Sequence, residues 1–289
     1  MEISLARIIM EFAYRVADRI QARAILLYVD AESDMTLLSE SRPSKDVILV
    51  TRRNDIPAGD FEFSGVLKMP DLELTRFGQI KIAIIKGIAT GLFKKQDKVV
   101  CLTGIPGFGY LDCVVIIDIG KEFEILASDN ALEIFEGIHA EVFEAILNIA
   151  LELGAKGREG RSVGTIFILG DHENVIRFTR QMIINPFAGH SEKERNILNP
   201  SLKETIREFS SLDGAFVIRG DGVVLTAGSY LNAAMEGHDI PQGLGSRHLA
   251  AAGITNLTNA VAMVVSESTG TVRVFKKGRM LLSIEKAIE

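Results

Sequence analysis

The chain has 289 residues, 47% of them apolar, so it is long enough for two domains with sizeable cores. Its formal net charge of −6 argues against a general nucleic-acid-binding surface, so any phosphate site must be local. No apolar run approaches the length of a membrane span, the N-terminus is too charged for a signal peptide, and Cys101 and Cys113 are predicted to be buried thiols. These features predict a cytoplasmic protein with neither membrane nor nucleic acid as partner.

The first half of the chain alternates strands and helices. Apolar residues at helical spacing predict a helix from Leu5 to Ile20, and a second helix is predicted over 78–93. Short apolar runs predict strands at 24–29, 47–51, 65–68, 99–103 and 114–119. The last two are continuously apolar and are expected to be buried on both faces. This order predicts a small, mostly parallel α/β domain over residues 1–127.

One glycine-rich turn follows the strand at 99–103. Gly104, Gly107 and Gly109 lack the spacing of a dinucleotide fingerprint, and a strand follows them, so a backbone role is favoured over a phosphate cradle. The segment "VVCLTGIPGFG" and the strand–helix order resemble the C-terminal α/β domain of pyruvate kinase. This resemblance implies a fold, and a regulatory or oligomerising role is our hypothesis for the domain.

A long helix is predicted to connect the two halves, and it opens the second domain, 128–289. It begins at the capping residues Ser128–Asn130 and ends at Gly154 and Gly157. The run Lys156–Arg161 then has the composition of a linker. A solvated turn is favoured there over an arginine-rich clamp.

The second half predicts a mixed α/β domain with a central, mainly antiparallel sheet flanked by helices. Helices are predicted at 174–184, 200–210 and 244–253. Strands are predicted at 163–169, 214–218, 223–227, 260–265, 271–275 and 280–284. The loop between Phe187 and Pro200 carries His190, which has no partner spacing and is expected at the surface.

Two short segments of this half carry chemistry. Asp213 stands at the start of a strand, where a carboxylate can hold a divalent cation or accept a proton from a hydroxyl. The turn Gly245–His248 opens a helix and combines bare backbone N–H groups with a guanidinium, which suits phosphate. Tyr230–Leu231 and Ser266–Glu267 lie at other element ends, where one crevice can gather them all.

These segments resemble a known family. "LDGAFVIRGDGVVLTAGSYL", "GLGSRHLAAAGIT" and "AVAMVVSESTG" are similar to the catalytic domain of diadenylate cyclases, whose hallmarks are an Asp-Gly-Ala motif and a Gly-(Thr/Ser)-Arg-His motif. The resemblance covers residues 160–284, and the preceding α/β half is similar to the archaeal branch of these enzymes.

The resemblance implies a reaction and an assembly. Two ATP molecules are condensed to cyclic di-AMP, the second messenger, with release of two pyrophosphates. Each protomer holds one ATP, two catalytic domains meet face to face in a homodimer, and a higher homo-oligomer is compatible with this. A divalent metal is implied as cofactor, with Mn²⁺ expected ahead of Mg²⁺.

The resemblance also implies roles for individual residues. Asp213 and His248 are the expected catalytic residues, and Asp213, His248 and Glu267 the expected metal ligands. The expected substrate-binding residues are Gly214, Ala215, Tyr230, Leu231, Gly245, Ser246, Arg247, Ser266 and Glu267.

The chain departs from the family pattern at three positions. Leu249 replaces the arginine of the commoner Arg-His-Arg motif, Ser268 replaces a second glutamate, and Leu212 stands where some members have a histidine. Two further hypotheses stay open, a non-catalytic nucleotide sensor and a structural interaction protein. A carboxylate beside a triphosphate repels it unless a metal is bound, so Asp213 argues against a mere sensor.

Overall fold

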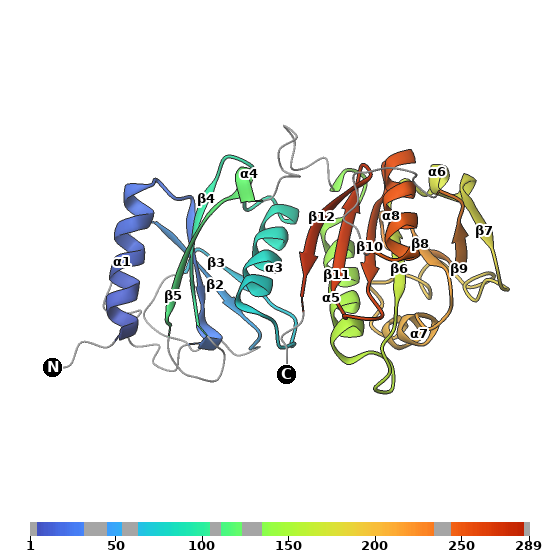
Figure 1. Cartoon of the computed structure of the whole chain (residues 1–289), viewed down its shortest axis with the longest axis horizontal. Helices are drawn as coiled ribbons and strands as arrows, with labels where there is room; N and C mark the ends of the chain where they lie inside the picture. Colours follow the sequence, from blue (N-terminus) through green and yellow to red (C-terminus); the bar gives the residue numbers. More distant parts are fainter. Residues whose placement is uncertain are drawn as a thin grey trace. The chain divides into compact units, whose positions relative to one another are not determined.

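The computed structural model describes residues 5–31, 45–53, 63–104, 111–122, 135–233 and 244–285. The chain divides into two compact units, Met1–Ala131 and Leu132–Glu289, and each is described here by itself (Figure 1). The predicted boundary after residue 127, the capping residues Ser128–Asn130 and the glycines Gly107 and Gly109 all lie outside the described residues.

The first unit is built on a five-stranded sheet in the order β3-β2-β1-β4-β5. Its strands are β1 (Ala24–Tyr28), β2 (Asp46–Thr51), β3 (Gly65–Lys68), β4 (Lys98–Thr103) and β5 (Cys113–Asp118). The first four run parallel, and β5 pairs antiparallel with β4. The prediction of a small, mostly parallel α/β sheet is confirmed.

Two longer helices, α1 (Leu5–Arg19) and α3 (Arg76–Ala89), flank this sheet on its two sides (Figure 1). The short elements η1 (Val29–Ala31) and α4 (Ile119–Glu122) follow β1 and β5. Helix α1 packs through small or flexible side chains, Ala6, Met10, Ala13 and Ala17, and leaves Leu5, Ile8 and Phe12 exposed. Strand β5 is an edge strand and Ile116 is 48% exposed, so the prediction that it is buried on both faces was wrong.

The second unit has a seven-stranded sheet in the order β12-β11-β10-β6-β8-β9-β7. Its strands are β6 (Thr165–Leu169), β7 (Thr179–Gln181), β8 (Ala215–Ile218), β9 (Val224–Leu231), β10 (Val261–Val265), β11 (Val272–Lys276) and β12 (Arg279–Ile284). Only the pair β6–β8 is parallel among these neighbours. The predicted mainly antiparallel sheet flanked by helices is therefore confirmed.

Helices cover both faces of this sheet (Figure 1). One face packs against α8 (Ser246–Leu257) and α6 (His172–Arg177), in a core that includes Ile168, Val217, Ala251 and Val264. The other face carries α5 (Ala140–Lys156) and α7 (Leu202–Phe209). There Phe167 stacks on Phe216 with ring centroids 5.0 Å apart.

Two predicted helices differ from the structure. The helix expected over 174–184 ends at Arg177, because the next residues form β7 and pair with β9 at the edge of the sheet. The connecting helix α5 starts at Ala140, since Gly137 has a φ of +72° and the His139 amide donates to the Gly220 carbonyl before the helix begins.

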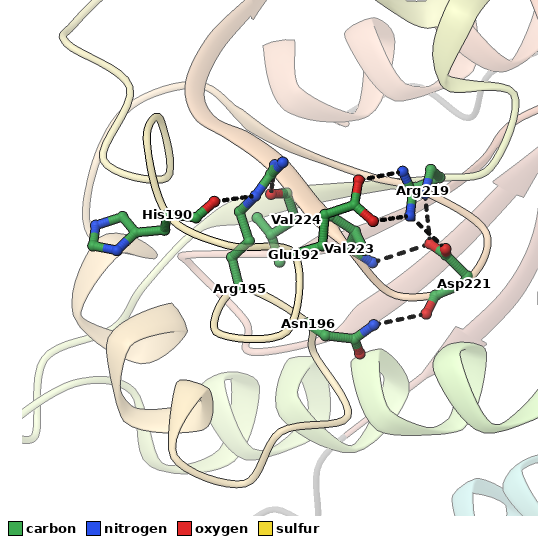
Figure 2. Close-up of polar contacts among 8 residues, drawn as sticks. All are labelled: His190, Glu192, Arg195, Asn196, Arg219, Asp221, Val223 and Val224. Atoms are coloured by element: carbon green, nitrogen blue, oxygen red, sulfur yellow. Dashed lines mark hydrogen bonds and ion pairs between the residues drawn. The ribbon is translucent and has the colours of Figure 1, made fainter.

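The loop between β7 and α7 is fixed to the β8–β9 hairpin by polar contacts (Figure 2). The Arg219 guanidinium donates to both oxygens of Glu192 at 2.8 Å and to Asp221 at 2.7 and 2.8 Å. Arg219 therefore holds the pKa of both carboxyls below their usual range. The Asp221 carboxylate serves this structural purpose at the hairpin end of β8, away from Asp213 at the other end of the strand.

Candidate active site

Four strand ends meet at one edge of the second sheet. β6 and β8 are parallel, whereas β9 and β10 run antiparallel to them, so the starts of β6 and β8 lie beside the ends of β9 and β10. Gly164 precedes β6, Asp213 precedes β8, Tyr230 lies near the end of β9 and Glu267 follows β10. The sheet thus gathers residues that are far apart in the sequence.

Arg247, in the first turn of α8, connects two of the predicted site residues. Its Nη1 donates to Glu267 Oε2 at 2.9 Å, and its Nη2 donates to Asp213 Oδ1 at 3.2 Å. The two carboxylates are 59% and 88% exposed and the guanidinium is 32% exposed. Screening by water makes such a bridge weak, so both carboxylates stay available to a ligand.

Two glycines give this cluster its shape. Gly164 lies under the bridge, where an added Cβ would come within 2.6 Å of Arg247 Nη1 and 2.9 Å of Glu267 Cβ. Gly214 has a φ of +101°, and a Cβ there would approach backbone atoms of Gly228 and Ser229 to 2.8 Å. Both positions need glycine, and Gly214 fixes how the chain turns from Asp213 into β8.

The start of α8 provides hydrogen-bond donors. Gly245 is its N-cap, and no side chain caps the helix. The amides of His248 and Leu249 donate to the Gly245 carbonyl, while no described residue accepts from the amides of Ser246 and Arg247. Open amides at the positive end of a 12-residue helix favour an anion.

His248 is buried, with 6% of its surface exposed. Its Nε2 lies 3.1 Å from Arg273 Nη1; because arginine only donates, Nε2 accepts and the ring proton belongs on Nδ1. Burial, and after it the charges of Arg273 and Arg247, lower the pKa of His248 to about 4. The ring is therefore neutral at pH 7.

The other predicted residues lie around this centre. Tyr230 is 49% exposed with Arg180 above its ring, 5.7 Å from the centroid, whereas Leu231 and Ala215 are buried in the core beneath α8. Ser266 is buried in the turn after β10, and its hydroxyl lies 3.3 Å from that of Ser268. The structure thus places Asp213, Arg247 and Glu267 in direct contact, and Leu231 and Ala215 behind them.

The fit to a divalent metal differs among the three predicted ligands. Asp213 and Glu267 offer carboxylate oxygens on the same guanidinium, which is the donor type that Mg²⁺ and Mn²⁺ take. Among the described residues, no three His, Cys, Asp or Glu side chains come close enough to share one ion. His248 is thus not grouped with the two carboxylates, and its Nε2 is already held by Arg273.

A cavity of about 210 Å³ adjoins the Arg247 bridge. Arg247 and Glu267 form one wall, and Arg158, Arg161 and Ser211 are among the residues of the other walls. Composition favoured a solvated turn for Lys156–Arg161, and no sequence pattern indicated Gly164 or Arg273. The glycine-rich composition of 156–164 was the one sequence signal that could have indicated Gly164 and the cavity beside it.

Within the described parts of the chain, no helix combines the length and the apolar character needed to cross a bilayer.

Two family models match the chain. Residues 152–280 match the family described as "DisA bacterial checkpoint controller nucleotide-binding", and residues 7–126 match "Probable sensor domain DacZ_P". The two matches fall on the second and the first unit, respectively.

Curated relatives are similar over most of the chain. A protein of Methanocaldococcus jannaschii named diadenylate cyclase is 38% identical over 207 residues, which cover 71% of this chain and 66% of that protein. A Haloferax volcanii protein of the same name is 36% identical over 212 residues, covering 72% of this chain and 75% of that one.

The solved structure of DacA from Staphylococcus aureus is 23% identical and covers 52% of this chain and 87% of that chain, with a TM-score of 0.32. The family match over the site and the two archaeal relatives establish the identity of the chain: it belongs to the diadenylate cyclase family of nucleotidyltransferases.

Proposed function

We propose that this protein condenses two ATP molecules into cyclic di-AMP and releases two pyrophosphates. Family membership supports this activity, and one observation carries it at the level of residues. Arg247 joins Asp213 and Glu267 beside the open amides of α8. Nucleotidyl transfer needs an acceptor for a hydroxyl proton and a positive environment for phosphate, and this cluster supplies both.

The reaction follows from these groups. The 3′-hydroxyl oxygen of one ATP forms a bond to the α-phosphorus of the other, the bond from that phosphorus to the bridging oxygen breaks, and pyrophosphate leaves. Asp213, at 88% exposure, takes the hydroxyl proton. Arg247 and the amides of Ser246 and Arg247 neutralise phosphate charge. A second, equivalent transfer closes the ring.

A divalent cation, Mn²⁺ ahead of Mg²⁺, would be held by Asp213 and Glu267 together with the phosphates, where it would lower the pKa of the attacking hydroxyl and screen the triphosphate. Arg247 forms ion pairs with both Asp213 and Glu267 in this structure. It must therefore exchange at least one of these carboxylates for a phosphate when nucleotide binds. His248, buried against Arg273, positions the first turn of α8.

Each protomer has one such site, and the reaction joins two nucleotides. We therefore propose that two copies meet face to face, each holding one ATP. The specific activity should then rise with protein concentration until the dimer is saturated.

The test is an incubation of the protein with ATP and Mn²⁺ or Mg²⁺, with products identified by mass spectrometry. Asp213→Asn should abolish cyclic di-AMP. Asp71→Asn is the matched control, because Asp71 is an exposed carboxylate of the first unit, and it should leave the activity unchanged. ATP that is bound but unchanged with each cation and protein concentration would refute the proposal and favour a non-catalytic nucleotide sensor.

A further inference from the structure

A short turn at the end of α5 borders the cavity beside the candidate active site. The amide of Arg158 donates to the Arg161 carbonyl at 2.9 Å, and the amide of Arg161 donates back at 2.8 Å. Gly157 has a φ of +61°, and a Cβ there would lie 2.0 Å from the Arg161 carbonyl oxygen. The backbone of this turn is therefore closely fixed, unlike that of a flexible linker.

The two arginines of the turn differ in their partners. Arg158 is held by α7: its guanidinium donates to both oxygens of Glu208 and, at 3.1 Å, to the hydroxyl of Ser211. Arg161 is exposed, and its guanidinium pairs with none of the described residues, although it lines the same cavity as Arg247 and Glu267. The turn thus presents the Arg161 guanidinium to the cavity beside the active site, together with the exposed carboxylate of Glu159, which lines the same cavity.

The order of the strands gives the site a direction. Along the shared edge, β9 comes first, then β8, β6 and β10. Tyr230, one of the expected substrate-binding residues, lies at the β9 side. Arg247, at the start of α8, donates to Glu267, which follows β10. A nucleotide with its base at β9 and its phosphates at Arg247 extends toward the cavity that Arg161 lines.

We infer that Arg161 binds the terminal phosphates of ATP and keeps hold of them as pyrophosphate when the bond to the α-phosphorus breaks. This inference deepens the proposed function and rests on it. The transfer leaves negative charge on the departing pyrophosphate, so a guanidinium carried near that group by a turn of fixed backbone stabilises the transition state as well as the bound nucleotide. Arg161 also brings positive charge to a chain of net charge −6.

Binding of three ligands tests this assignment: ATP, inorganic pyrophosphate and AMP, each measured by titration calorimetry on the full chain. Arg161→Gln should weaken ATP and pyrophosphate about tenfold, the size expected for one charged hydrogen bond, and leave AMP unchanged. Lys156→Gln is the matched control, since Lys156 is an exposed cation of the same segment that does not line the cavity. It should change none of the three affinities.

A conservative variant separates charge from folding. Arg161→Lys keeps the positive charge and should recover part of the pyrophosphate affinity, while the melting temperature of all three variants should stay near that of the unmodified protein. Pyrophosphate should also inhibit cyclic di-AMP synthesis about tenfold less in Arg161→Gln.

The outcomes keep the two proposals apart. Equal pyrophosphate affinity in the unmodified protein and in Arg161→Gln, or an equal loss for AMP and ATP, overturns the assignment of Arg161 whether or not cyclic di-AMP is made. Selective loss of pyrophosphate in a protein that makes no cyclic di-AMP supports the phosphate site and refutes the cyclase.

Discussion

The burial of His248 predicts how the catalytic unit responds to acid. In the unfolded chain the ring binds a proton below its ordinary pKa of 6.5, whereas burial and two neighbouring guanidinium groups lower the pKa of the folded ring to about 4. Between these values the unfolded state binds more protons, so stability must fall as the pH falls.

The size of the effect follows from the two pKa values. Full expression of a shift from 6.5 to about 4 corresponds to about 3 kcal/mol, and between pH 7 and pH 5 the free energy of unfolding should fall by about 2 kcal/mol from this group. Carboxylates also titrate toward pH 5, so the contribution of His248 must be isolated by a variant. His248→Gln places an amide oxygen where Nε2 accepts from Arg273 and removes the titration.

Hydrogen exchange of the amides in β10, followed by mass spectrometry at pH 7 and pH 5 and corrected for intrinsic rates, reports the opening free energy of this unit. Between pH 7 and pH 5 the unmodified protein should lose about 2 kcal/mol more of its opening free energy than His248→Gln, which corresponds to an exchange rate about 30-fold higher at pH 5. An identical pH response in the two proteins would refute the neutral, buried His248 and its contact with Arg273.

Two further predictions concern single positions. Gly214→Ala should destabilise the catalytic unit by roughly 1–3 kcal/mol more than Gly189→Ala in the same exchange experiment. Both residues have positive φ, but only at Gly214 would the added Cβ also meet backbone atoms, at 2.8 Å. Equal losses of stability in the two variants would contradict the crowding at Gly214. The thiol of Cys101 is fully buried, and burial raises its pKa. A thiol reagent at pH 8 should therefore modify half-buried Cys113 first and Cys101 only after unfolding, as measured by peptide mass mapping. Modification of Cys101 at the rate of Cys113 in the folded protein would contradict the burial of Cys101.

Much of the fold could be predicted because apolar runs and helical spacing are local signals. The strand at 65–68 has the predicted bounds, and the helix that begins at Leu5 ends one residue before Ile20. The segment 174–184 could not be predicted in this way, since β7 exists only because β9 lies beside it. The exposure of β5 likewise depends on its position at the sheet edge, which no local pattern records.

The candidate site shows the same division. The motifs indicated Asp213, Arg247 and Glu267, and the structure brings these three into contact. The contact between His248 and Arg273 could not be inferred from the neighbours of His248 in sequence, because Arg273 comes from β11. At Lys156–Arg161 composition favoured a solvated turn over an arginine-rich clamp, because the fixed backbone of the turn and the adjoining cavity appear only in three dimensions.

The edge where the four strand ends meet also bears on how the protein folds. Thr165 pairs with Val265, one hundred residues later in the chain, and these two residues directly flank Gly164 and Ser266. Closing so long a loop costs entropy that only the finished sheet repays, which makes this pairing a slow step of folding. A nascent or partly folded chain therefore lacks the cluster of Asp213, Arg247 and Glu267, and nucleotide binding at the proposed site would report that the whole catalytic unit has folded.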